Sequence, residues 1–187
     1  MNGVVIAKAT FEKYFAQFST RTYTKHWPLI NAGDEFRKVF YLKRGYVRLY
    51  ALSSEGKELT LIVYKSGDFF PIFTALMPLS PYRYWVETMT PCEIIAVPVD
   101  SFVAFFKKNP ELLLDLAVKI MVRFDGALRR MEYLAFGSVA QRLTSLILIL
   151  GERFGKQIPQ GIYIEPPFTH KDLANLVGIT RETASAI

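Results

Sequence analysis

The sequence has very few of the side chains that hold metals and cofactors. Among its 187 residues are one cysteine, Cys92, and two histidines, His26 and His170. A single thiol excludes an internal disulfide framework and a cysteine-ligated iron–sulfur cluster. A haem would need one of these three as its axial ligand, and each histidine is better explained as a structural or surface residue. We therefore expect no metal and no cofactor, in a reducing compartment.

Several functional classes also lack their sequence signatures. No uncharged apolar run reaches the roughly 20 residues that span a bilayer, and no signal peptide precedes Phe11, so we expect a cytoplasmic protein without membrane contact. We find no glycine-rich phosphate loop and no nucleophile–base pair. Asp115, Asp125 and Glu132 fit solvated charges on a helix face better than a catalytic pair. We expect no catalytic residues and no enzyme.

Apolar and basic residues are plentiful. The chain is 51% hydrophobic with 15 Phe and 10 Tyr, which is enough to build a sizeable core. Its net charge of +6 would tolerate a polyanionic partner. However, residues 1–50 carry nine Lys or Arg against three acids, and residues 137–187 carry five against four. Charge alone therefore does not indicate DNA.

The first half of the chain has the pattern of a β domain. Aromatic and β-branched runs alternate with turn signals such as Arg44-Gly45, the segment 53–56 and Gly67-Asp68. This spacing predicts an all-β sandwich or barrel. The expected strands cover residues 36–42, 46–50, 59–64, 85–89 and 93–97.

A helical pattern follows Pro98. A short helix is expected over residues 100–107, and Asn109-Pro110-Glu111 resembles the start of a second helix, with Asn109 as its cap. Apolar residues then recur at alternating intervals of three and four, as in the seam of paired helices. A buried helix in a monomeric core is the alternative. The expected dimer-interface residues are Leu113, Ala117, Ile120, Phe124, Ala127, Met131 and Leu134.

The last fifty residues predict a helix-turn-helix. Gly137 ends or bends the long helix, and another helix runs from Ser138 to Gly151. Residues 169–177 then form a short helix capped by Thr169, Gly178 makes the left-handed turn, and Thr180 caps a second helix. A plain helical hairpin with solvated charges is the alternative. The expected DNA-binding residues are Thr169, His170, Lys171, Thr180, Arg181, Glu182, Thr183 and Ser185.

These features together resemble one family over nearly the whole chain. The segments that carry the resemblance are Ala32-Gly33-Asp34, residues 42–50, Gly56-Lys57-Glu58, Lys65-Ser66-Gly67-Asp68-Phe69, Asn109-Pro110-Glu111-Leu112-Leu113 and Thr180-Arg181-Glu182-Thr183. The sequence is similar to the catabolite-activator/FNR-type (Crp/Fnr) regulators.

The resemblance implies an α+β protein in three parts. Residues 1–108 would form a sensory β-roll (a double-stranded β-helix or jelly roll) like a cyclic-nucleotide-binding domain. Residues 109–136 would form the dimerisation helix, and residues 137–187 an incomplete winged helix-turn-helix. It also implies a homodimer on a two-fold symmetric DNA site, controlled by an effector in the β-roll.

The cyclic-AMP chemistry of the family is not preserved. Where cyclic-AMP sensors hold the phosphate and ribose, Pro71 replaces a glycine and Ile72 replaces a glutamate, within the stretch 70–75. The phosphate arginine corresponds to Tyr82, and Arg83 falls one place later, on the opposite face of a strand. Ala127 and Leu128 replace the adenine-binding hydroxyls. We therefore expect that cyclic AMP is not the effector.

Two hypotheses for the β-roll follow. One is a pocket for a small hydrophobic or aromatic effector, oriented by Arg83 or a tyrosine hydroxyl. The other is a roll filled by its own side chains, with no effector. The candidate pocket residues are Tyr64, Phe70, Ile72, Tyr82, Arg83, Phe124, Ala127 and Leu128.

The DNA-reading end departs from the family as well. Ala186 stands where members commonly carry an arginine, and the sequence stops at Ile187 inside the expected recognition helix. We therefore expect weak or undetectable DNA binding from this chain as it stands. A dimeric ligand-sensing module that does not bind DNA is the alternative function.

Overall fold

The computed structural model describes residues 10–35, 37–73, 77 and 81–187. The chain forms two compact units: Met1–Ala51 with Ile62–Val122, and Leu52–Leu61 with Arg123–Ile187. The expected α+β architecture is confirmed. The three ranges expected from the sequence were assigned by function, not by compactness, so these two units do not test them and they stay predictions.

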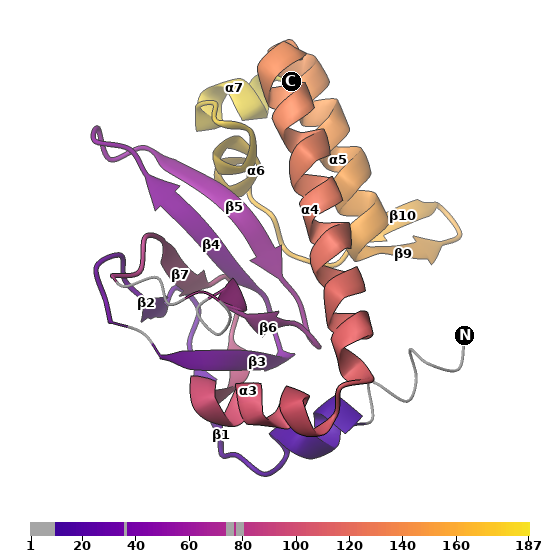
Figure 1. Cartoon of the computed structure of the whole chain (residues 1–187). Coiled ribbons are helices and arrows are strands. Elements are labelled where there is room, and N and C mark those ends of the chain that lie inside the picture. Colours follow the sequence, from indigo (N-terminus) through magenta and orange to yellow (C-terminus); the bar gives the residue numbers. More distant parts are fainter. Residues whose placement is uncertain (1–9, 36, 74–76, 78–80) are drawn as a thin grey trace. The chain divides into compact units, whose positions relative to one another are not determined.

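Two four-stranded antiparallel sheets make up the β domain (Figure 1). One sheet has the order β1 (Thr20–Tyr23), β8 (Cys92–Pro98), β3 (Lys38–Arg44) and β6 (Phe69–Phe70). The other has the order β2 (Pro28–Ile30), β7 (Trp85–Thr88), β4 (Val47–Leu52) and β5 (Glu58–Tyr64).

The five expected strands are present with bounds shifted by one or two residues. Strand β3 continues through Arg44, so the turn begins at Gly45, whose φ of +99° needs a residue without a side chain. The expected first position, Phe36, lies outside the described residues. Strands β1, β2 and β6 were not predicted because they are only two to four residues long and have no clear alternation.

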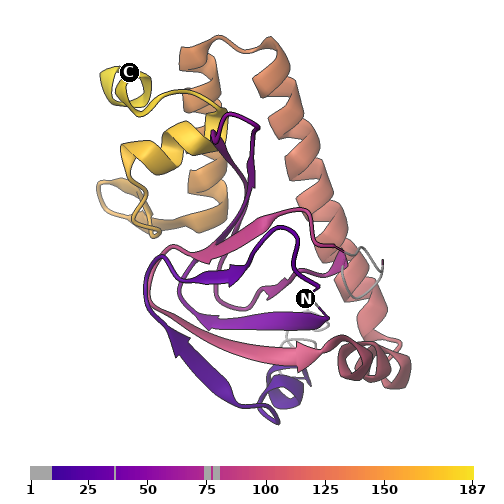
Figure 2. The ribbon, with the colours of Figure 1, turned by 90° about the vertical axis from the view of Figure 1, so that its left-hand side faces the viewer.

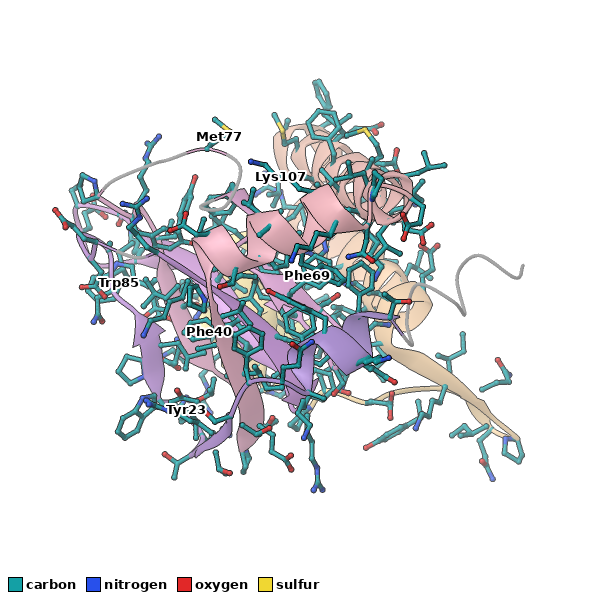
Figure 3. The ribbon with its side chains drawn as sticks, turned by 60° about the horizontal axis from the view of Figure 1, so that its bottom comes forward. Tyr23, Phe40, Phe69, Met77, Trp85 and Lys107 are labelled. Atoms are coloured by element: carbon teal, nitrogen blue, oxygen red, sulfur yellow. The ribbon has the colours of Figure 1, made fainter. Side chains whose placement is uncertain are left out.

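Aromatic side chains fill the core of this unit. The rings of Phe15 and Tyr41 stack with centroids 4.3 Å apart, and both belong to a buried cluster. In Figure 3, Phe69 lies on the side of the sheet that faces the helix carrying Lys107. That helix, α3 (Val99–Lys108), buries Phe102 and Phe106 in the same cluster. The abundant phenylalanine noted in the sequence is therefore mainly core.

The predicted cap at Asn109 is wrong. Helix α4 (Leu112–Phe136) begins three residues later, and the Asn109 side-chain amide donates to the carbonyl of Phe105, 2.7 Å away, at the end of α3. Asn109 therefore closes the preceding helix, because the last carbonyls of α3 have no donors within that helix.

The other unit is mainly helical. The bend at Gly137 is confirmed: a Cβ there would lie 2.5 Å from the carbonyl oxygen of Tyr133. Helix α5 (Val139–Phe154) starts at a capping box in which Ser138 accepts from the amide of Gln141. Figure 2 shows α5 returning alongside α4 after this bend.

A short hairpin follows α5 and was not predicted from the sequence. It consists of β9 (Gly155–Ile158) and β10 (Gly161–Ile164). Gly161 has a φ of +140°, which suits a turn residue without a side chain. Helices α6 (His170–Val177) and α7 (Arg181–Ala186) complete the unit.

No helix in the part of the chain that the structure describes is both long and apolar enough to cross a bilayer. The same part of the chain contains no group of three or more His, Cys, Asp or Glu side chains arranged to hold a metal ion.

Candidate DNA-binding interface

Helix α6 begins at the predicted cap, Thr169, and the structure shows that the cap is reciprocal. The amide of Asp172 donates to the Thr169 hydroxyl at 3.2 Å, and the amide of Thr169 donates to the Asp172 carboxylate at 2.8 Å. The Thr169 hydroxyl also donates to that carboxylate. These bonds satisfy backbone donors that a helix start leaves open, so they fix the position of the first turn.

A tight turn joins α6 to α7. Gly178 adopts the left-handed conformation with φ +70°, and its amide and that of Ile179 both donate to the carbonyl of Ala174. Thr180 then caps α7 by accepting from the amide of Thr183 at 3.2 Å. Ala174 and Ala184 are buried, because two helices in close contact require small residues. This is the predicted helix-turn-helix. Ile179, which follows the turn glycine, is half-buried.

The predicted DNA-binding side chains lie on the outside of this motif. Thr183 is half-buried and the other seven are exposed: Thr169, His170, Lys171, Thr180, Arg181, Glu182 and Ser185.

A shallow groove crosses the starts of the two helices. It is lined by Phe168, Thr169, His170, Lys171 and Arg181. Lys171 and Arg181 are its cationic residues, and the Asp172 carboxylate already occupies the amino end of α6. A second hollow is lined by Arg181, Glu182, Ser185 and Ala186. Phe168 is the one lining residue that the sequence did not suggest.

The predicted dimer residues are mostly uncovered in the single chain. Of the seven, Ile120 and Leu134 are half-buried and Ile120 packs against the aromatic core. By contrast, Leu112 and Leu116 on another face of α4 are buried in that core. The large exposed members of the predicted seam are Leu113, Phe124 and Met131.

The effector candidates in the β domain form part of its aromatic packing. Tyr64 and Phe70 are buried and stack with centroids 4.5 Å apart. Tyr82 is buried and stacks on Phe73, whereas the next residue, Arg83, is exposed. This is the reversal expected of neighbours in an extended segment.

Tyr82 has an unusual hydroxyl. No residue that the structure describes offers it a hydrogen bond, and burial raises the pKa of this phenol well above its ordinary value. Ile72 is half-buried against the core. Positions 74 and 75 of the expected nucleotide-binding stretch lie outside the described residues. The remaining candidates, Phe124, Ala127 and Leu128, lie in the other unit and are exposed.

Sequence reasoning missed one group of residues. The Arg130 guanidinium donates to the carbonyls of Leu61, Thr60 and Leu176. Nearby, the Asn175 amide donates to the Glu58 carboxylate at 2.8 Å. No pattern indicated these contacts, since backbone carbonyls are present at every residue.

Family models match both halves of the chain. Residues 20–109 match the cyclic nucleotide-binding domain, and residues 141–187 match the Crp-like helix-turn-helix domain. A β-sheet domain of this kind, a long helix and a helix-turn-helix define a class of transcription regulators. The chain belongs to the Crp/Fnr family, and it is a transcription regulator rather than an enzyme.

Two curated relatives and one solved structure illustrate the similarity. The chain is 27% identical over 179 residues to the cAMP-activated global transcriptional regulator CRP of Pasteurella multocida, covering 95% of this chain and 85% of the relative. It is 26% identical over 167 residues to the global nitrogen regulator of Nostoc, covering 89% and 75%. The c-di-GMP responsive regulator CLP of Xanthomonas campestris has the same fold, with a TM-score of 0.79, 23% identity and coverage of 95% and 88%.

Proposed function

We propose that the protein acts in the cytoplasm as a homodimer that binds a two-fold symmetric DNA site. Its activity is controlled by a small hydrophobic or aromatic effector other than cyclic AMP. The alternative is that the protein acts without an effector. One observation carries the DNA-binding part: a capped helix α7 buries Ala184 on one side and exposes Arg181, Glu182 and Ser185 on the other. Side chains at the start of such a helix reach base edges in the major groove.

Exposed apolar residues on the outer face of α4 support the proposed homodimer. Phe124 and Met131 are 57% and 66% exposed, and they lie one heptad apart with Leu128 between them, at 48%. Apolar stripes of this kind lose their contact with water when two helices pair. A second copy of the chain offers the same stripe, which is what two-fold symmetry requires.

A selection experiment tests DNA binding. Because we expect weak binding, the selection uses low salt, and we expect a random duplex library to yield a palindromic consensus with the unmodified chain. We expect Arg181→Ala to relax selection at one base pair of each half-site, with a loss of about 1–3 kcal/mol. Lys156→Ala is the matched control, because Lys156 is an exposed cation that pairs with Glu165 on the β9–β10 hairpin. If the unmodified chain selects no consensus, the result would favour the alternative function, a dimeric ligand-sensing module that does not bind DNA.

The effector proposal depends on the residues that replace the nucleotide ligands. Pro71 has no amide hydrogen, and it is buried together with the phenol of Tyr82. Neither residue can neutralise a phosphate, and burying an unpartnered phosphate is strongly unfavourable.

Calorimetry tests this directly. We expect no heat of binding with cyclic AMP, and micromolar binding would contradict the proposal. A thermal-shift screen with aromatic and aliphatic metabolites then separates the two remaining cases. A stabilising compound that loses its effect in Tyr82→Phe would support a pocket that uses this hydroxyl, and a screen without stabilisers would support a self-filled roll.

A further inference from the structure

Arg130 lies on α4 and reaches two other segments of its compact unit. One arm of its guanidinium donates to the Leu61 carbonyl at 2.8 Å, and the other donates to the carbonyls of Thr60 and Leu176. Thr60 and Leu61 belong to β5, while Leu176 lies in the last turn of α6. A single side chain therefore connects the β4–β5 hairpin to the first helix of the helix-turn-helix.

Both acceptor segments can accept from an outside donor. Strand β5 is at the edge of its sheet, so every second backbone carbonyl along it faces no strand among the described residues. Helix α6 has no basic residue in its last turn, although its last carbonyls carry the negative end of the helix dipole. Arg130 supplies a positive charge and several N–H donors to both places.

The chemistry of this contact requires arginine. Burial lowers the pKa of Arg130 from its ordinary value, yet a guanidinium stays protonated in proteins. The free-energy cost of desolvating this charge is offset by its hydrogen bonds to backbone carbonyls. Lysine keeps the charge but has a single nitrogen, so it cannot span three carbonyls on two segments.

A further contact joins the same segments. The Asn175 amide on α6 donates to the Glu58 carboxylate on β5 at 2.8 Å. Leu59 lies close to the turn of the motif, because a Cβ added at Gly178 would be 3.8 Å from its side chain. Arg181 and Glu182 of the predicted DNA-reading residues are exposed.

We propose that Arg130 is a positioning residue that couples the Leu52–Leu61 hairpin to the helix-turn-helix, so that the hairpin sets the orientation of the recognition helix. This inference rests on the proposed DNA-binding function. Weakening the coupling is expected to loosen both segments together and to reduce binding to the specific site, while contacts with non-specific DNA, which depend on charge alone, persist.

The test compares Arg130→Lys with Arg129→Lys in the full chain by amide hydrogen exchange. Arg129 is the adjacent residue and is exposed and paired with Asp125. Neither variant changes the net charge, because lysine is cationic like arginine. We expect Arg130→Lys to raise exchange about tenfold in both 58–61 and 174–178, and Arg129→Lys to leave both segments unchanged. Unchanged exchange in either segment of Arg130→Lys would overturn the coupling.

A second variant covers the case in which Arg130→Lys unfolds the protein. Asn175→Asp replaces the amide that donates to Glu58 with a carboxylate at a half-buried position and leaves Arg130 in place. We expect a folded protein with a slightly lower melting temperature and faster exchange in 58–61, and exchange equal to that of the unmodified chain would count against coupling.

DNA binding provides the functional readout. We expect Arg130→Lys to weaken binding to the duplex selected with the unmodified chain about tenfold and to leave binding to a scrambled duplex unchanged. Equal loss on both duplexes would overturn the positioning role. If the unmodified chain selects no duplex, the proposed function fails, whereas the exchange data still decide whether Arg130 couples the two segments.

Discussion

Gly45 and Cys92 approach so closely that a Cβ on residue 45 would lie 2.6 Å from the Cys92 sulfur and 2.5 Å from the carbonyl oxygen of Pro91. Gly45 makes the turn between β3 and β4, and Cys92 is the first residue of β8. The turn therefore needs glycine for two reasons: its positive φ and its lack of space.

This relationship predicts the effect of Gly45→Ala. We expect it to destabilise the protein by about 2–4 kcal/mol, because the backbone of Pro91 cannot move as a flexible side chain can. Gly56→Ala is the matched control: its φ is +76° but nothing lies within 4 Å of the added methyl, so about 1 kcal/mol is expected. Urea unfolding measures both, and equal losses would show that only the dihedral angle matters.

The exposed stripe of α4 predicts a change in oligomeric state. We expect Phe124→Glu to convert a dimer into monomers, because two like charges would replace two apolar rings in the interface. Thr144→Glu on α5 introduces the same charge at another exposed helix position. Analytical ultracentrifugation over a range of concentrations measures the effect. A dimer that persists in Phe124→Glu would place the interface elsewhere.

The cap at Thr169 predicts a moderate loss of stability. We expect Thr169→Ala to cost about 1 kcal/mol, because the amide of Asp172 loses its acceptor. Thr144→Ala, in the exposed interior of α5, is expected to be neutral or slightly stabilising. Chemical denaturation compares the two, and a smaller loss for Thr169→Ala than for Thr144→Ala would contradict the capping role.

We expect the buried phenol of Tyr14 to make the unfolding free energy depend on pH. Burial raises the pKa of its phenol to about 12, above the value near 10 expected in an unfolded chain. Its contribution to stability is therefore complete below about pH 10 and is lost as the pH rises toward 12.

The variant Tyr14→Phe should remove that part of the pH dependence. We expect its unfolding free energy to fall less steeply than that of the unmodified chain between about pH 9 and pH 11. Tyr163→Phe, at a 58% exposed position, is the control. Identical slopes for Tyr14→Phe and the unmodified chain would rule out the burial effect.

The sequence predicted the elements that have local signals. The caps at Thr169 and Thr180, the left-handed Gly178 and the bend at Gly137 each depend on neighbouring residues, so their residue types indicated them. The cap at Asn109 failed although its residues looked suitable. An asparagine between two helices can serve either, and its side chain bonds the helix before it.

The residues that replace the nucleotide ligands of cyclic-AMP sensors illustrate a partial success. Alternation of faces predicted that Arg83 would point away from the side of Tyr82, and Tyr82 is buried while Arg83 is exposed. That the Tyr82 ring would stack on Phe73 could not be predicted, since stacking depends on how loops and sheets come together.

By itself the sequence determined the family, the longer strands and helices and the exposed face of the recognition helix, because periodicity, capping and turn residues act over a few positions. Only the tertiary structure decided that Arg130 joins β5 to α6 and that Asn175 bonds Glu58, 117 residues away. Each of these contacts forms only when segments distant in the chain meet in space. The three acceptors of Arg130 are backbone carbonyls, which every residue has, so the residue types at those positions could not indicate the contact.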